Sequence, residues 1–191
     1  MPKQNRARPG LASPLSLPSY DPDDADMLVV VIETPKGSRN KYAFDPEERV
    51  FTLTKVLPAG MEFPYDFGFV PSTKGGDGDP LDALVLMDEP AFPGCRLTCR
   101  AIGIIEGEQV DKKDSERNDR LVCVERGTHS YSHIRHVDDL GKAFGKELEN
   151  FFVNYHQISG KTFHVLAMKG PGQALRQVKA CRKAARADAA A

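Results

Sequence analysis

Residues 77–82 read Asp-Gly-Asp-Pro-Leu-Asp, and an apolar run, Ala-Leu-Val-Leu-Met, follows at once over residues 83–87. Gly78 permits a sharp turn and Pro80 fixes its own φ angle, so this stretch predicts a loop that feeds a buried strand. Three like charges this close repel one another, and a bound cation removes that cost. A solvated acidic turn is the alternative that the stretch alone leaves open.

The residue types narrow the kind of cation. An EF-hand calcium loop fits poorly, because its fifth and sixth positions would be Leu81 and Asp82 and its twelfth would be Asp88 instead of glutamate. Mg²⁺ suits a cluster made only of carboxylates better, since it keeps several waters and takes phosphate oxygens as further ligands.

The size and charge of the chain indicate one soluble domain with tails. It has 191 residues, of which 40% are hydrophobic and 28% are charged, an ordinary composition with enough apolar residues for a core. The formal net charge of −1 argues against a nucleic-acid or membrane partner, which would select a basic excess. No apolar run approaches a membrane span, and the four cysteines form no Cys-x-x-Cys pair. We therefore expect a cytoplasmic protein with reduced thiols.

The hydrophobic pattern divides the chain into three parts. Residues 1–26, with five prolines, predict a flexible N-terminal arm. Residues 27–170 predict the main domain, and residues 171–191 predict a C-terminal helix and tail. β-Branched, alternating or aromatic runs predict its strands, at 27–32, 41–44, 49–56, 61–70, 84–87, 96–106, 121–125 and 162–168.

The period becomes helical only after residue 137. Apolar residues recur at three- and four-residue steps from Val137 to Tyr155, Gly160 is a plausible stop, and residues 172–187 predict a second helix. Short strands followed by helices give an α+β fold with a small closed or partly open β-barrel at its centre, flanked by two helices. The strands at 41–44 and 49–56 predict a hairpin or meander, and the mixed-charge run 107–120 predicts an exposed hairpin tip.

Several segments resemble the soluble family I inorganic pyrophosphatases, in the family's order and spacing over about residues 28–168. The acidic hexapeptide 77–82 is the most specific of them. The others are Val30-Val31-Ile32-Glu33-Thr34-Pro35, Asn40-Lys41-Tyr42, Phe63-Pro64-Tyr65-Asp66-Phe67-Gly68-Phe69 and Phe151-Phe152-Val153-Asn154-Tyr155.

The resemblance implies a five-stranded, OB-like barrel that hydrolyses pyrophosphate to two phosphates with several Mg²⁺ ions, and a homo-oligomer, a hexamer or smaller. Asp77 and Asp82 would hold metal, Asp79 would handle the proton of the attacking water, and Glu33 would act from behind these contacts. The residues expected to contact phosphate are Lys41, Lys55, Tyr155 and Arg120, and the further metal candidates are Asp114 and Asp119. Cations are needed because a polyanionic substrate repels an anionic nucleophile.

The chain departs from the family pattern at several of these positions. Ala43 stands where glutamate is usual, Lys55 where arginine is usual, and Phe67 where a tyrosine is expected. In the second acidic motif, Asn118 falls where an aspartate is expected and Arg120 where a lysine is expected, and Asp114 fits only with a one-residue shift. His156 replaces a lysine after Tyr155.

Three functions remain open on the sequence. The first is an active Mg²⁺-dependent inorganic pyrophosphatase, supported by the three aspartates together with Lys41 and Tyr155. The second is a divergent homologue that acts slowly or on another phosphoanhydride, because of the departures. The third is an OB-like module that binds a strand of nucleic acid or a protein without catalysis, which the aromatic stretch 63–69 supports and the near-neutral charge opposes.

Overall fold

In the computed structural model, residues 13–111 and 114–189 are described, and in them five strands close into a ring. The ring runs β2 (Asp24–Thr34), β5 (Asp66–Phe69), β6 (Asp82–Leu86), β9 (Arg120–Glu125) and β7 (Arg96–Asp111), and β7 pairs back onto β2. The pair β6–β9 is parallel, whereas the other neighbours in the ring are antiparallel. The predicted α+β fold with an OB-like ring is confirmed.

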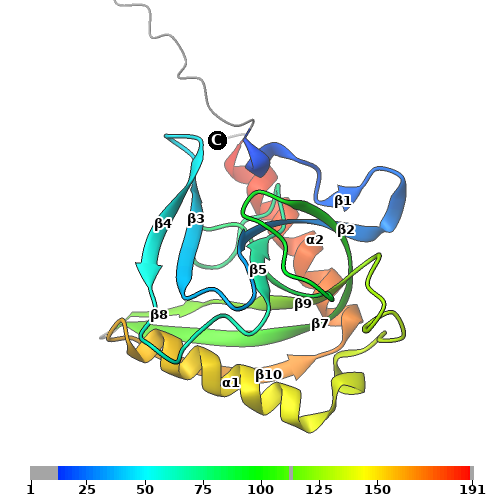
Figure 1. Ribbon diagram of the computed structural model, residues 1–191. Coiled ribbons are helices and arrows are strands. Elements are labelled where there is room, and N and C mark those ends of the chain that lie inside the picture. The colour runs from blue at the N-terminus through cyan, green and yellow to red at the C-terminus, as the bar shows by residue number, and fades with distance from the viewer. Residues whose placement is uncertain (1–12, 112–113, 190–191) are drawn as a thin grey trace, which may run out of the picture.

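The remaining strands extend this ring. β1 (Tyr20–Asp21) pairs with β2, β8 (Asp114–Arg117) pairs with β7, and β10 (Thr162–Lys169) pairs with β7 as an edge strand. β3 (Asn40–Asp45) and β4 (Val50–Val56) form a separate hairpin that stands beside the ring (Figure 1). The predicted hairpins at 41–56 and 107–120 are therefore both present, although Lys112 and Lys113 lie outside the described residues.

Two long helices flank the ring, as the helical period predicts. The 3-10 turn η2 (Val137–Leu140) leads into α1 (Gly141–Gln157), which lies along β10, and α2 (Pro171–Asp188) packs against β7 (Figure 1). α1 buries one stripe of side chains, and these are Phe144, Leu148, Phe152, Tyr155 and His156. This stripe, at helical spacing, brings Tyr155 and His156 to one end of the ring.

β5 lies very close to its paired neighbour β2 at Gly68, because this residue has no side chain. A Cβ atom built on Gly68 would collide with the backbone of Val31 and Ile32, so only glycine allows this approach. Phe67, the residue before Gly68, is buried in the core, and the chain continues from β5 into the loop of residues 70–81 before β6.

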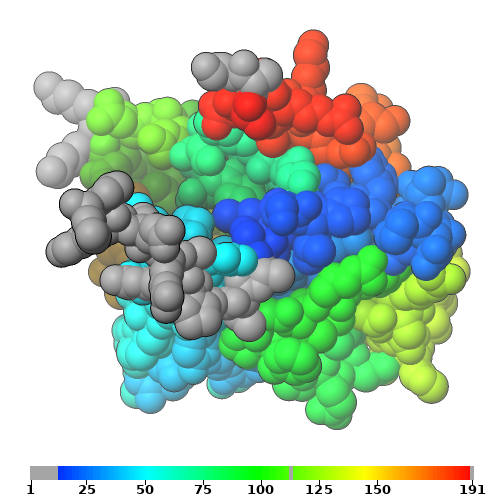
Figure 2. All heavy atoms as spheres, turned by 90° about the horizontal axis from the view of Figure 1, so that it is seen from above, coloured from blue at the N-terminus to red at the C-terminus, as the bar shows by residue number. Residues whose placement is uncertain are grey.

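The described part of the predicted N-terminal arm packs onto the domain. Residues 14–16 form the 3-10 turn η1, β1 pairs with β2, and the buried Ser19 hydroxyl donates to the carbonyl of Pro71 at 2.6 Å. Figure 2 shows this segment lying between α2 and residues of the loop before β7. Order thus begins before residue 27, which differs from the expectation of a flexible arm up to residue 26. Residues 1–12 of that arm, and residues 190–191 of the predicted tail, lie outside the described residues.

Candidate active site

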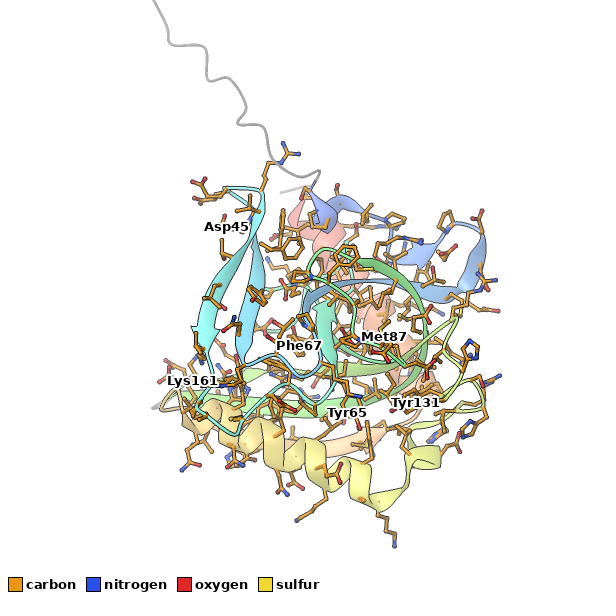
Figure 3. The ribbon with its side chains drawn as sticks, in the orientation of Figure 1. Asp45, Tyr65, Phe67, Met87, Tyr131 and Lys161 are labelled. Carbon is orange, nitrogen blue, oxygen red and sulfur yellow. The ribbon has the colours of Figure 1, made fainter. Side chains whose placement is uncertain are left out.

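One pocket of about 470 Å³ opens at the end of the ring where β6 and β9 begin. Its acidic wall is the loop of residues 77–82, which contributes Asp77, Asp79 and Asp82. Basic and aromatic side chains make up much of the rest of the lining, called the basic wall here, and they are Lys41, Lys55, Arg120, Phe152, Tyr155, His156 and Lys161. Phe67 lies near the centre of the ring and Lys161 beyond the C-terminal end of α1 (Figure 3), and both line this pocket.

The acidic loop is held by its own turn. Gly78 has a φ angle of +91°, which favours glycine, and the backbone N–H of Asp79 donates to Oδ1 of Asp77 at 3.2 Å. Asp77 and Asp79 are exposed, whereas the side chain of Asp82, at the start of β6, is 24% exposed. All three predicted carboxylates therefore share one pocket.

Two carboxyl groups of this wall, those of Asp77 and Asp82, bind protons more readily than isolated ones. Burial raises the pKa of Asp82 to about 6 against the opposing effect of Arg120 and Lys41, and Asp77 and Asp79 raise it further. Partial desolvation by its surroundings also raises the pKa of Asp77, and the charge of Asp79 adds to this effect. A cation bound among them would relieve both the desolvation and the mutual repulsion.

Glu33 faces the same carboxylates from β2. Its side chain lines a neighbouring cavity of about 350 Å³ together with Lys41, Asp79 and Asp82. Oε1 accepts the backbone N–H of Phe44 at 2.9 Å, which ties β2 to the hairpin. Burial raises the pKa of Glu33 to about 7 against the effect of that hydrogen bond.

The hairpin β3–β4 supplies two lysines that lie opposite each other on its paired strands. Lys41 and Lys55 are register partners, and their Nζ atoms lie 5.7 Å and 4.9 Å from the centre of the Tyr155 ring. Lys55 also donates to the hydroxyl of Ser159. Burial alone would lower the pKa of Lys41, but Tyr155, Asp82 and Glu33 outweigh it and raise the pKa, so Lys41 is a cation at neutral pH.

Arg120 is the buried cation of the site. It is the register partner of Asp82 across the parallel pair β6–β9, and its Nε lies 3.6 Å from Oδ2 of Asp82. Burial lowers the pKa of Arg120, while Asp82 opposes this effect. A guanidinium nevertheless stays charged in proteins, so the pocket holds a fixed positive charge beside the acidic wall.

The other two predicted metal ligands do not line this pocket. Asp119 is 6% exposed, and its Oδ1 accepts hydrogen bonds from the backbone N–H of Gly107 at 3.0 Å and from Nη2 of Arg117 at 2.8 Å. It shares only a small cavity with Asp77 and Asp82. Asp114 lines a separate cavity at the tip of the β7–β8 hairpin. From this hairpin, Glu116 and Asn118 line the main pocket instead.

Sequence reasoning missed three further lining residues, Gln109, Ser159 and Lys161. Ser159 and Lys161 flank Gly160, where the helical period stops, so their closeness in sequence to Tyr155 was the available signal. Gln109 sits in the long strand β7 opposite Glu116, and only the pairing register places it at the pocket.

The described residues hold no group of three or more His, Cys, Asp or Glu side chains already arranged around a metal position. This does not conflict with a hydrated Mg²⁺, which binds through one or two carboxylates and keeps several waters. Asp77, Asp79 and Asp82 offer the oxygen donors that such an ion prefers. The residues present therefore fit a divalent cation of this kind.

Comparisons with known proteins show the family to which the chain is similar. The sequence pattern of the inorganic pyrophosphatase family matches residues 30–186. An inorganic pyrophosphatase from Synechocystis sp. is 38% identical over 159 residues, which are 83% of this chain and 92% of the relative, and one from Streptomyces coelicolor is 42% identical over 129 residues, 68% of this chain and 77% of the relative. The crystal structure of inorganic pyrophosphatase from Thermus thermophilus superposes with a TM-score of 0.83 at 33% identity, and covers 92% of this chain and 99% of that one.

The fold and the pocket define a phosphoanhydride hydrolase. The chain belongs to the inorganic pyrophosphatase family, the hydrolases that split pyrophosphate into two phosphate ions. These relatives do not favour the non-catalytic binding module that the sequence left open. Among the described residues, none of the helices is long and apolar enough to cross a bilayer.

Proposed function

We propose that this chain hydrolyses pyrophosphate with Mg²⁺ bound at the acidic wall of the pocket. The observation that carries the proposal is that Asp77, Asp79 and Asp82 share one pocket with the four groups expected to contact phosphate, Lys41, Lys55, Arg120 and Tyr155. Carboxylates and phosphate-binding groups that line the same pocket suit a small polyanion that arrives with its metal.

The acidic wall has two tasks in this proposal. Asp77 and Asp82 hold the metal, and Asp79 accepts the proton of the attacking water. Asp79 is suited to this because its backbone is fixed to the Asp77 side chain while its own carboxylate is exposed in the pocket. Bound Mg²⁺ supplies neutralisation of the substrate's charge and lowers the pKa of a coordinated water.

The basic wall binds and stabilises phosphate. Lys41, Lys55 and Arg120 place positive charge where charge grows on the leaving phosphate. Tyr155 can donate a hydrogen bond to a phosphate oxygen without adding charge. Glu33 acts from behind this layer, because it helps to keep Lys41 protonated.

The test is phosphate release from pyrophosphate with and without Mg²⁺, for the native chain and Asp79→Asn. We expect release that depends on Mg²⁺, and a loss of about 10²–10⁴-fold in kcat in the variant, the range for a general acid or base. Glu89→Gln is the matched control, because Glu89 is exposed beyond the other end of β6 and its replacement also removes one negative charge. Turnover in Asp79→Asn equal to that of Glu89→Gln would contradict the proposal.

We also propose that the chain forms a homo-oligomer. Support comes from apolar side chains that are exposed on the described surface, among them Leu53 on β4 at 54% and Leu166 on the edge strand β10 at 51%. Sedimentation velocity tests this, and a monomer at micromolar concentration would contradict it. The cytoplasmic location and the absence of a nucleic-acid partner stay predictions from the sequence.

A further inference from the structure

Two of the positions where the chain departs from the family pattern lie in contact with each other. Arg120 begins β9 and is 3% exposed, and His156 lies near the C-terminal end of α1 and is 5% exposed. Nη2 of Arg120 lies 3.2 Å from Nε2 of His156. These two departures, 36 residues apart in sequence, therefore form one structural unit.

The chemistry of the two groups fixes the direction of this hydrogen bond. A guanidinium carries five N–H donors and has no acceptor. Nε2 of His156 must therefore be the acceptor, and the ring is neutral. Burial, and then the charge of Arg120, lower the pKa of His156 to about 3, which agrees with this assignment. His156 thus brings no positive charge to the pocket.

The rest of the surroundings hold the guanidinium plane in place. Its central carbon lies 4.3 Å from the centre of the Phe152 ring and 4.6 Å from that of Phe163. The His156 ring stacks on Phe163 at 4.8 Å with an interplanar angle of 11°. Arg120 is thus held by two aromatic rings and by the histidine that one of them supports.

The hydrogen bonds of Arg120 within the protein leave some of its N–H groups free to bind a ligand. Nη1 donates to the carbonyl of Asn118 at 3.0 Å, and Nη2 donates to His156. Each terminal nitrogen keeps a second N–H that these two bonds do not use, and Arg120 lines the main pocket. Since an arginine side chain has many rotamers, each fixed bond reduces the freedom that substrate binding would otherwise have to remove.

We propose that His156 is a positioning residue, whose neutral ring accepts a hydrogen bond from Arg120 and thereby directs the remaining N–H groups of the guanidinium at phosphate oxygens in the pocket. The proposal rests on the proposed role of Arg120 in substrate binding. A lysine at position 156, as the resemblance predicts, would act as a separate cation, whereas histidine supplies an acceptor and acts through Arg120.

Steady-state kinetics of pyrophosphate hydrolysis with saturating Mg²⁺ test this with three variants. His156→Gln keeps an acceptor, and we expect its KM within about twofold of the native value. His156→Leu has no acceptor, and we expect KM to rise about tenfold, the loss of one hydrogen bond to a charged group, with kcat changed less than about threefold. His156→Lys carries only donors and repels Arg120, so we expect its KM to rise at least as much as in His156→Leu.

The His156→Lys variant tests whether residue 156 is needed as a hydrogen-bond acceptor or as a positive charge. A KM in His156→Lys equal to or below the native value would overturn the proposal, as would a Gln variant as impaired as the Leu variant. The thermal midpoint of each variant is measured alongside, and if the Leu variant does not fold, the Gln and Lys variants decide the question.

A double-mutant cycle separates positioning from general packing. In an Arg120→Lys background, His156→Leu should raise KM by less than about twofold, because the group that it positions is gone. Full additivity of the two changes would overturn the proposal. If Arg120→Lys alone leaves KM unchanged, the proposed role of Arg120 fails. If Arg120→Lys raises KM and His156→Leu does not, only the positioning by His156 fails.

Discussion

Two acidic stretches approach the pocket, one before β6 and one around β8, and they are used differently. Residues 77–82 present all three of their carboxylates to it. Residues 114–120 hold as many acidic side chains, but Asp114 faces a separate cavity and Asp119 is bound to Gly107 and Arg117. Of the second group only Glu116 lines the main pocket, so the path of the backbone, and not the density of charge in the sequence, selects the residues that reach the site.

The largest effect is expected from removing the carboxylate of Asp82. This residue begins β6, faces Arg120 and lines both the main pocket and the cavity beside it. Its replacement removes a proposed metal ligand and leaves the Arg120 charge without its partner. In Asp82→Asn we expect kcat/KM for pyrophosphate to fall by at least about a hundredfold, as for other losses of a charge-stabilising group.

Asp114→Asn makes the same chemical change in the other stretch. We expect it to alter kcat/KM by less than about twofold, because Asp114 does not line the pocket. Equal losses in the two variants would show that the two stretches are not used differently.

A second experiment adds a carboxylate to residues 114–120, the stretch that contributes fewer carboxylates to the pocket. Asn118 lines the main pocket, so Asn118→Asp places a fourth aspartate beside Asp77, Asp79 and Asp82. We expect the Mg²⁺ concentration for half-maximal activity to fall about fivefold, since one added charge near a cation is worth on the order of 1 kcal/mol in a site open to water.

Ser115→Asp is the control for that change. Ser115 lies on β8, the strand just before Asn118, and is exposed, so the added charge stays outside the pocket. An equal shift in the two variants would mean that the general field of the hairpin, and not a ligand in the pocket, changes the affinity for Mg²⁺.

The dependence of stability on pH should distinguish His156, at the pocket, from Asp21, in the N-terminal segment. His156 has a folded-state pKa of about 3 against an ordinary value of 6.5, so the unfolded chain binds more protons between these values. Its contribution to stability is complete above pH 6.5 and is lost as the pH falls toward 3, with a slope of at most about 1.4 kcal/mol per pH unit. Urea unfolding of His156→Gln should show a flatter decline from pH 6 to 4 than that of the native chain.

Asp21 provides the contrasting titration. Its Oδ2 accepts from Thr98 at 2.7 Å and from Arg96 at 2.8 Å, and its pKa is lowered to about 2 by these hydrogen bonds, with that to Thr98 first. Its contribution is complete above pH 3.8 and is lost as the pH falls through 2. Asp21→Asn should therefore flatten the decline below pH 4 and leave the slope between pH 6 and 4 unchanged. A change only in the upper range would contradict the assignment.

The smallest effect is expected at Phe67. It lines the main pocket and the cavity beside Glu33, at a position where the family pattern has tyrosine. We expect Phe67→Tyr to lower KM by about two- to fivefold, the value of one added hydrogen bond of ordinary strength. An unchanged KM would show that the side chain at position 67 does not contact the substrate.

The sequence allows much of the acidic wall and the fold to be predicted. The turn at Gly78, the apolar run into β6 and the apolar period of α1 are local signals, and each is confirmed. The predicted hairpin at 41–56 is also present, and it brings Lys41 and Lys55 together. Each of these depends on neighbours within one element or one turn.

The rest depends on contacts between distant segments. β1 has only two residues and lies in a proline-rich stretch, so its own sequence does not predict a strand. It is held by pairing with Leu28 and by the hydrogen bonds that Asp21 accepts from Arg96 and Thr98. The positions of Asp114, Asp119 and Asn118 follow from the pairing of β8 with β7 and from the hydrogen bond to Gly107. The contact of Arg120 with His156 needs the packing of α1 over the ring, which no local pattern encodes.

The most direct measurement is a crystal structure of the chain with Mn²⁺, an anomalously scattering stand-in for Mg²⁺, and phosphate. We expect anomalous peaks bound to Asp77 and Asp82, with phosphate oxygens between the metal and Arg120. Peaks only at the hairpin tip, beside Asp111 and Asp114, with no metal on the loop of residues 77–82, would contradict it.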